Sequence, residues 1–261
     1  MNEDPDLSGV RVERDGPVAT VLLDRPDRLN AQTPYTWAAL REAGRSLADD
    51  VRVVVVRGAG RSFSAGLDRA AFSPGGIPGV PALPELAEMS PADGDAILRD
   101  YQAGFTWLRR PDIVSVAVVQ GHAVGAGFQL ALACDLRVLA DDAQFSMAES
   151  TYGLVPDLTG TAPLVAAVGY SRALELCVTA RRVGAAEALE LGLATLVVGA
   201  AELDAAVADL VAAVLAPPPN AVTEIKALLL DATGRPREEQ EAAERAAQLR
   251  RLIDLRGLDR G

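Results

Sequence analysis

Two glycine-rich turns in the sequence have the composition of a site that binds a polarised oxygen. The first is GAGRSFSAGLD, residues 58–68, and the second is GHAVGAGFQLALACD, residues 121–135. Each follows a β-branched run and leads toward a helix, whose first N–H groups have no internal partner and lie at the positive end of the helix dipole. If the two turns converge, their free N–H groups form an oxyanion hole.

The remaining side chains argue against nucleophilic and metal chemistry. His122 is the only histidine, and the sequence has neither a GxSxG elbow nor an HExxH helix. The two cysteines, Cys134 and Cys177, are far apart and lack CxxC spacing, which is typical of reduced, buried thiols. We therefore expect no metal site and no Ser/His/Asp triad. His122 is interpreted as a packed or hydrogen-bonded residue beside the second turn.

Composition narrows the class of protein. With 261 residues, 49% of them apolar and 23% charged, the chain has the values of a soluble globular protein with one main domain. Its net charge of −11 at pH 7 repels phosphate backbones, so we expect no nucleic-acid partner. The acidic start MNEDPDLSG has no signal-peptide pattern, and no later stretch suits a membrane span. The sequence predicts a cytoplasmic protein.

Strands that alternate with helices predict an α/β fold around the two turns. A hairpin is expected over 10–24, turning at Asp15-Gly16, and a helix is expected after Thr33, with Pro34 at its first position. Further strands are expected at 51–57, 113–119, 136–139, 143–147 and 195–198. Further helices are expected at 94–109, from Pro156 toward Val168, and at 171–180, 185–191, 202–215, 220–232 and 237–255. The stretch 72–93, rich in Pro and Gly, predicts an irregular loop.

Four ordered blocks together resemble the enoyl-CoA hydratase/isomerase (crotonase) superfamily. The blocks are VLLDRPDRLNA, VVVVRGAGRSFSAGLD, GHAVGAGFQLALACD and AQFSMAESTYGLVPD, and the resemblance covers about residues 10–200. It implies a spiral of ββα turns with a C-terminal helical region. Residues 1–200 would form the core with an acyl-CoA site, and residues 201–261 would serve for covering or assembly. The resemblance also implies a homotrimer or a dimer of trimers.

The same resemblance implies roles for individual residues. The thioester oxygen would be held by the backbone N–H groups of Leu67 and Ala126, and a lost donor of this kind typically costs about 3–4 kcal/mol of barrier. Coenzyme A would be part of the substrate, with no separate cofactor. The residues implied in binding it are Arg28, Leu29, Ala65, Gly66, Asp68, Gly125 and Lys226, and the arginines Arg25, Arg61 and Arg69 lie beside the matched turns, where they can contact phosphates.

The sequence departs from the hydratase pattern in its acids. Hydratases that this chain resembles carry two glutamates, and Gln129 stands at the first of these positions, whereas Glu149 is retained at the second. An amide cannot act as a general base at neutral pH. Asp157 stands where the dienoyl-CoA isomerase branch also places an aspartate, although it could equally be a helix N-cap.

These residues favour double-bond isomerisation of an enoyl- or dienoyl-CoA, with Glu149 and Asp157 as the acid/base pair and Gln129 as a hydrogen-bonding group. The alternatives are hydration by Glu149 alone and a non-catalytic acyl-CoA binding protein. A dinucleotide site at GAGFQL is disfavoured because Leu130 replaces the third glycine of that fingerprint.

Overall fold

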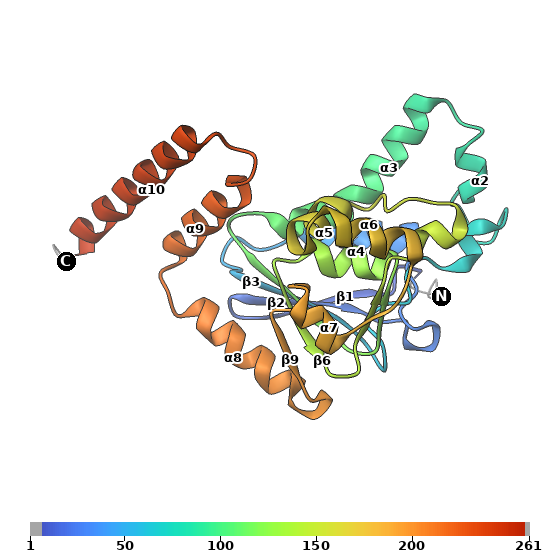
Figure 1. The fold of residues 1–261 in the computed structure, drawn as a ribbon, viewed down its shortest axis with the longest axis horizontal. Coiled ribbons are helices and arrows are strands. Elements are labelled where there is room, and N and C mark those ends of the chain that lie inside the picture. Colours follow the sequence, from blue (N-terminus) through green and yellow to red (C-terminus); the bar gives the residue numbers. More distant parts are fainter. Residues whose placement is uncertain (1–6, 259–261) are drawn as a thin grey trace, which may run out of the picture.

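The main sheet has six strands in the spatial order β1-β2-β3-β4-β6-β9 in the computed structural model, which describes residues 7–258 (Figure 1). These strands are β1 (Val10–Asp15), β2 (Val18–Leu23), β3 (Val53–Gly58), β4 (Val114–Val119), β6 (Leu136–Ala140) and β9 (Leu196–Val198). β1 and β2 pair antiparallel, as expected for the hairpin, and the other neighbours pair parallel. A smaller sheet contains β5 (His122–Val124), β7 (Gln144–Ser146) and β8 (Val183–Gly184).

The chain winds repeatedly between the two sheets. β4 in the main sheet is followed by β5 in the small one and then by helix α4 (Ala126–Ala133). β6 and β7 repeat this step and lead to α5 (Thr161–Val168) and α6 (Tyr170–Thr179). β8, α7 (Ala185–Glu190) and β9 close the series. The α/β spiral implied by the resemblance is therefore confirmed.

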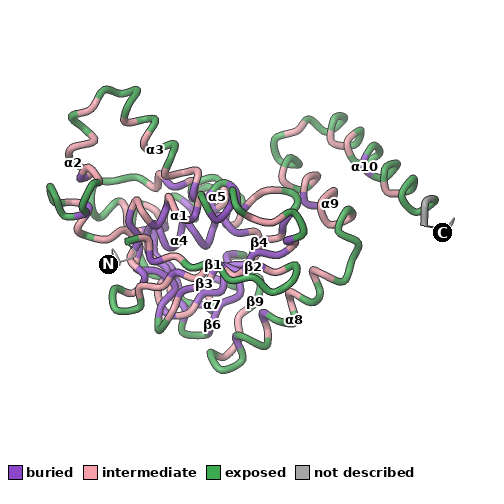
Figure 2. The backbone as a smooth tube through the Cα atoms, turned by 180° about the vertical axis from the view of Figure 1, so that it is seen from behind, coloured by how far each residue is buried: buried purple, intermediate pink, exposed green. Residues whose placement is uncertain are grey.

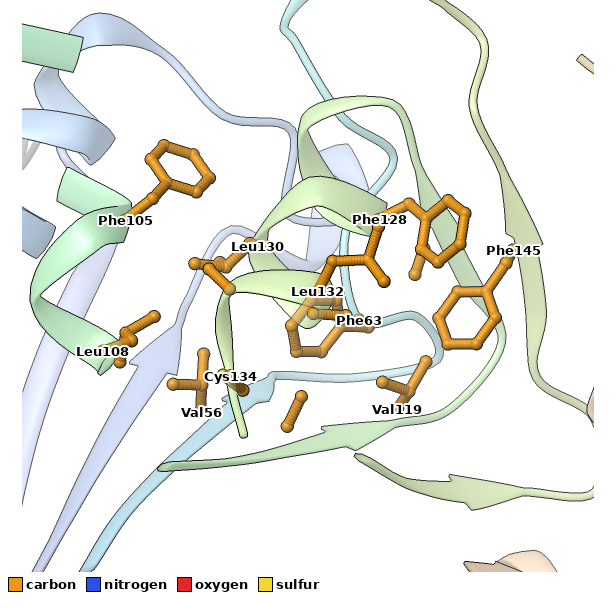
Figure 3. Close-up of a cluster of buried hydrophobic side chains, with 14 of the residues drawn as sticks. Val56, Phe63, Phe105, Leu108, Val119, Phe128, Leu130, Leu132, Cys134 and Phe145 are labelled. Atoms are coloured by element: carbon orange, nitrogen blue, oxygen red, sulfur yellow. The ribbon is translucent and has the colours of Figure 1, made fainter. Parts of the chain in front are cut away.

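Helix α4 lies at the centre of the hydrophobic core. All eight of its residues are buried, and Figure 3 shows Phe128, Leu130 and Leu132 pointing among side chains from the surrounding elements. The ring of Phe128 stacks on Phe145 of β7 with 4.4 Å between centroids. Burial raises the pKa of the Cys134 thiol to about 12, which agrees with the inert thiol expected there.

Helices cover one face of the main sheet and flank the spiral. α1 (Pro34–Arg45) starts where predicted, and the Thr33 side chain accepts a hydrogen bond from the Thr36 N–H. It packs against α3 (Pro91–Thr106), where the rings of Trp37 and Tyr101 are 4.7 Å apart. The opposite face of the sheet is covered by α8 (Leu203–Leu215), which buries Leu203 and Val207 against the valines of the strands.

Two C-terminal helices, α9 (Pro219–Asp231) and α10 (Arg237–Leu258), form a hairpin that extends away from the spiral (Figures 1 and 2). Several large apolar side chains on this hairpin are exposed, namely Ile225, Leu229, Leu249, Leu252, Ile253 and Leu255. Within residues 7–258, every helix is too short or too polar to cross a bilayer.

The structure corrects the expectation of an irregular loop over 72–93. A short helix, α2 (Leu83–Leu86), forms within it, and the Ala82 N–H donates to Glu85 Oε2 at 2.7 Å. Helix α3 then begins at Pro91, because the Ser90 hydroxyl accepts from the Asp93 N–H as an N-cap. The helix expected directly after Pro156 instead begins at Thr161.

Candidate active site

A cavity of about 640 Å³ lies where the two glycine turns meet α2, α3 and the segment before α5. Its walls are mainly apolar, as in most small-molecule sites. The lining residues are Arg28, Ala31, Trp37, Ala65, Gly66, Leu67, Asp68, Arg69, Phe72, Leu83, Leu86, Leu98, Tyr101, Val124, Gly125, Ala126, Gln129, Ala148, Glu149, Tyr152, Leu154, Val155, Asp157 and Leu158. The structure thus brings most of the predicted site residues to one cavity.

The first turn is held on both sides of Leu67. The Gln32 N–H donates to the Gly66 carbonyl at 2.7 Å, and the Asp68 N–H donates to the Gln32 carbonyl at 2.8 Å. The Leu67 N–H is the donor in neither of these two bonds. Gly66 has φ +86°, a conformation that side-chain-bearing residues rarely adopt. This conformation explains the need for glycine immediately before Leu67.

The second turn places Ala126 at the start of the buried helix α4. Gly125 precedes it with φ +52°, and Ala126 is the first helical residue, so its N–H has no partner inside the helix. The turns are in close contact: a Cβ built on Gly66 would lie 2.4 Å from the Val124 carbonyl oxygen and 3.5 Å from the Ala126 nitrogen. Leu67 and Ala126 therefore line the same cavity.

Gln129 holds Glu149 by a direct hydrogen bond. Its Nε2 donates to Glu149 Oε1 at 2.7 Å, while its Oε1 accepts from the N–H groups of Leu158 at 2.8 Å and Gly160 at 3.2 Å. The two backbone donors fix which end of the amide faces Glu149. Gln129 is 1% exposed, so both ends of its amide are hydrogen-bonded in a buried position. Glu149 Oε2 is buried without a hydrogen-bond partner in the described chain.

Burial makes both acids easier to protonate. Desolvation raises the pKa of Glu149, and the charge of Asp157 raises it further, although hydrogen bonds from its own backbone and from Gln129 oppose the shift. Desolvation also raises the pKa of Asp157. The N-cap of α5 is Gly160, so the interpretation of Asp157 as a helix cap is wrong. The backbone carbonyl oxygen of Asp157 accepts a hydrogen bond from Gln102 Nε2 of α3 at 2.8 Å.

The arginines expected near phosphates have different environments. Arg28 and Arg69 are exposed at the cavity lining. Arg25 instead forms a 3.0 Å ion pair with Asp68, so its charge is already partnered. Arg61 lies outside the lining. Leu29 also lies outside it, and its carbonyl accepts from the Ala65 N–H at 2.8 Å, which braces the first turn from behind.

Lys226 does not face the cavity, which contradicts its expected contact with coenzyme A. Its Nζ donates to Asp135 Oδ2 and to the Ile113 carbonyl, both at 2.7 Å, and only 8% of the residue is exposed. Burial lowers the pKa of this ammonium, and Asp135 opposes that shift. The charge therefore anchors α9 to the spiral and is not available to a phosphate.

Most of the apolar residues of the cavity wall were not predicted from the sequence. Leu83, Leu86 and Leu98 of α2 and α3 line the cavity, and the rings of Phe72 and Tyr152 lie 5.4 Å apart beside them. The N-cap pattern Ser90-Pro-x-Asp93 was a signal for α3 that could have located part of this wall.

The family model for enoyl-CoA hydratase/isomerase matches residues 13–254. The chain therefore belongs to the enoyl-CoA hydratase/isomerase family, and its fold is that of the crotonase superfamily. Among solved structures, a Thermobifida fusca protein assigned to the enoyl-CoA hydratases and crystallised with acetoacetyl-CoA has a TM-score of 0.91 and 51% identity. The match covers 95% of this chain and 96% of that one.

Two relatives differ in their reactions. EchA17 of Mycobacterium tuberculosis, named as a probable enoyl-CoA hydratase, is 35% identical over 246 residues, which are 93% of this chain and 86% of that protein. The peroxisomal Delta(3,5)-Delta(2,4)-dienoyl-CoA isomerase of Arabidopsis thaliana is 31% identical over 236 residues, which are 86% of this chain and 81% of that protein. Family membership therefore leaves the reaction to be argued from the site.

Proposed function

We propose that this protein isomerises a double bond in an enoyl- or dienoyl-CoA, with Glu149 and Asp157 as the acid/base pair. Three carboxyl side chains line the described cavity, and Asp68 is neutralised by its ion pair with Arg25. Glu149 and Asp157 remain, and burial raises the pKa of both. The observation that carries the proposal is the fixed Gln129 amide, because it removes one glutamate of the hydratase pattern and leaves Asp157 as the second acid.

The proton route balances within the pair. Ionised Glu149 takes the proton from C2 of a 3-enoyl or 3,5-dienoyl thioester through the unpaired Oε2, and the C–H electrons form a conjugated enolate. The negative charge develops on the thioester oxygen, where the N–H groups of Leu67 and Ala126 stabilise it. Protonated Asp157 returns a proton to the far end of the conjugated system. Glu149 then loses its proton to solvent and Asp157 takes one from solvent, which restores the starting state.

The charges and surfaces of the cavity support an acyl-CoA substrate. We assign the thioester end to Ala65, Gly66 and Gly125, which allow close backbone approach. The exposed guanidinium groups of Arg28 and Arg69 contact the phosphates of coenzyme A. The apolar residues of α2 and α3 contact the acyl group. The net charge of −11 makes these two arginines the local attraction for a polyanionic ligand.

The decisive experiment is product analysis with 3-enoyl-, 2-enoyl- and 3,5-dienoyl-CoA. The protein should convert the 3-enoyl or the 3,5-dienoyl substrate to a conjugated isomer of unchanged mass, followed by ultraviolet absorbance and mass spectrometry. In D2O the product should carry deuterium, because Glu149 and Asp157 exchange protons with solvent. Asp157→Asn should stop isomerisation, and Asp231→Asn, which removes an exposed carboxylate from the distant α9, is the matched control.

Other outcomes would assign other functions. A gain of one water with the 2-enoyl substrate, retained in Asp157→Asn, would identify a hydratase that uses Glu149 alone. Calorimetric binding of CoA thioesters without conversion of any of them would identify a binding protein. Either result overturns the isomerase proposal.

We also propose that the protein assembles as a homotrimer or a dimer of trimers. The support is the hairpin of α9 and α10, which leaves Leu229 70% exposed and Ile253 67% exposed. Exposed apolar residues that cluster on one element are typical of interfaces. Light scattering on the eluting protein should give a mass that is a multiple of three chains, and a monomer would contradict the proposal.

A further inference from the structure

Ser64 is joined through its backbone to the second glycine turn. Its N–H donates to the His122 carbonyl at 2.9 Å, and its carbonyl accepts from the Val124 N–H at 3.0 Å. These bonds form a parallel bridge between Ser64 and Ala123, three residues before Ala126. The contact with α4 is tight, because a Cβ built on Gly127 would lie 2.5 Å from the Ser64 carbonyl oxygen.

The side chain of Ser64 is joined to the first turn. Its hydroxyl accepts from the Gly66 N–H at 3.2 Å and from Gln32 Nε2 at 3.0 Å, and it donates to the Asn30 carbonyl at 2.8 Å. One donor and two acceptor positions are then all used. Gln32 is fixed in turn, because its Oε1 accepts from Trp37 Nε1 at 2.8 Å. Ser64 and Gln32 are both 0% exposed.

We propose that Ser64 is a positioning residue that sets the separation between the Leu67 and Ala126 amides. It is bonded through its main chain to one donor turn and through its hydroxyl to the other. The inference rests on the proposed oxyanion role of those amides. Ser64 is not itself one of the residues that line the cavity, so it acts through the two turns that it contacts.

Loss of the hydroxyl should disturb the transition state more than substrate binding. Ser64→Ala leaves the Gly66 N–H and Gln32 Nε2 without a partner in a buried site, which frees the Ala65–Gly66 peptide immediately before the Leu67 donor. The charge on the thioester oxygen exists only after the proton leaves, so misplaced donors affect kcat rather than KM. A shift of this kind lowers kcat by roughly tenfold to a hundredfold.

The test uses acetoacetyl-CoA, whose acidic α-carbon forms an enolate with its own ultraviolet band. The wild-type protein should bind the probe with enhanced enolate absorbance, and Ser64→Ala should lose most of that enhancement while its Kd for CoA is unchanged. Ser62→Ala is the matched control, because Ser62 is buried in the same turn but its Oγ lies 3.3 Å from His122 Nδ1. This control should keep the wild-type spectrum and kcat.

Gln32→Met is the second variant, and it removes one partner of the Ser64 hydroxyl with little change in volume. It should lower enolisation in the same direction if Ser64→Ala does not fold. Wild-type enolisation in a folded Ser64→Ala or Gln32→Met protein, or an equal loss in Ser62→Ala, would overturn the role of Ser64 alone. A wild-type protein that does not enolise the probe would instead overturn the proposed oxyanion function.

Discussion

The two walls of the cavity are built differently. The two glycine turns lie against α4, a helix with every residue buried, and the side-chain hydrogen bonds of Gln32 and Ser64 fix them. The opposite wall, from Phe72 through the first half of α3, is largely exposed, and a Cβ on Gly75 would meet nothing within 4 Å. Figure 2 shows the contrast as purple α4 against mostly green and pink α2 and the start of α3.

In the proposed mechanism, this difference separates the groups that stabilise charge from the surface that contacts the acyl chain. Groups that stabilise charge must be fixed before the reaction, because reorganisation during the step would weaken them. A wall that contacts an acyl chain has no such requirement, and few tertiary contacts allow it to adapt to chains of different size. The comparison predicts that equal substitutions have unequal effects on the two walls.

The largest effect is expected for the acids. Glu149→Gln should lower kcat by roughly a hundredfold to ten-thousandfold, because the amide cannot accept the substrate proton. Glu85→Gln, the same change in α2, should leave kcat near the wild-type value, since Glu85 only caps its own helix. Steady-state kinetics on the isomerised substrate measures both. Comparable rates in Glu149→Gln and the wild type would remove Glu149 from the mechanism.

Core packing should show the next difference, in stability. Phe128→Ala should lower the free energy of unfolding by about 3–5 kcal/mol, because it deletes a fully buried ring stacked on Phe145. Leu98→Ala should cost less than about 1 kcal/mol, since 36% of Leu98 is exposed. It should, however, alter the preference for acyl chain length. Urea denaturation and a panel of chain lengths give the two readouts, and equal destabilisation would refute the contrast.

Glycine substitutions test the walls at matched backbone conformations. Gly66 and Gly75 both have positive φ, 86° and 68°, but a Cβ on Gly66 would lie 2.4 Å from the Val124 oxygen. Gly66→Ala should separate the donor turns and lower kcat by about a hundredfold, as for a lost oxyanion donor. Gly75→Ala should cost only modest stability from backbone strain, without loss of kcat. Thermal unfolding and kcat distinguish these effects.

The smallest effect concerns pH and the buried acids. The folded pKa of Glu149 is raised above its unfolded value, so the folded state binds this proton more tightly. The contribution to stability is therefore present at low pH and is lost as pH rises through the folded pKa. The stability of the wild type relative to Glu149→Gln should rise as pH falls below neutral. A relative stability that falls on acidification would reverse the assigned direction.

In the proposed mechanism, the same raised pKa also sets the pH dependence of kcat. Because Glu149 must be ionised to take the proton, kcat should decrease on the acid side at a pH above that of an ordinary glutamate. Gln129→Met removes a hydrogen bond that lowers this pKa, so the acid limb should move to higher pH. An unchanged limb would show that another group controls it.

Local signals predicted the elements that form the candidate site. The glycines at the two turns, the Thr33-Pro34 helix start and the β-branched runs of β3 and β4 are each readable over a few residues, and the structure places them as expected. The positions of Glu149 and Asp157 came from the order of the matched blocks, and both reach the cavity.

The sequence did not predict the features that depend on contacts between residues far apart in the chain. Lys226 was predicted to contact coenzyme A, but its ammonium group pairs with Asp135, 91 residues earlier in the chain. Pro84 and Pro91 were interpreted as signs of an irregular loop, whereas each lies in the first turn of a helix. Proline is tolerated there because an N–H at that position would have no partner inside the helix. The link between Gln129 and Gly160 was also invisible, because it depends on how α4 and the segment before α5 meet.

The buried pair of Lys226 and Asp135 bears on how the C-terminal hairpin stays attached to the spiral. Asp135 also accepts from the Ser115 N–H and hydroxyl, so the ammonium at α9 closes a polar cluster at the edge of β4. Salt screens buried charges only weakly, so high salt should not disrupt this contact between α9 and the spiral. Truncating Asp135 would leave the Lys226 ammonium buried without its carboxylate partner. The hairpin of α9 and α10 would then detach before the spiral unfolds.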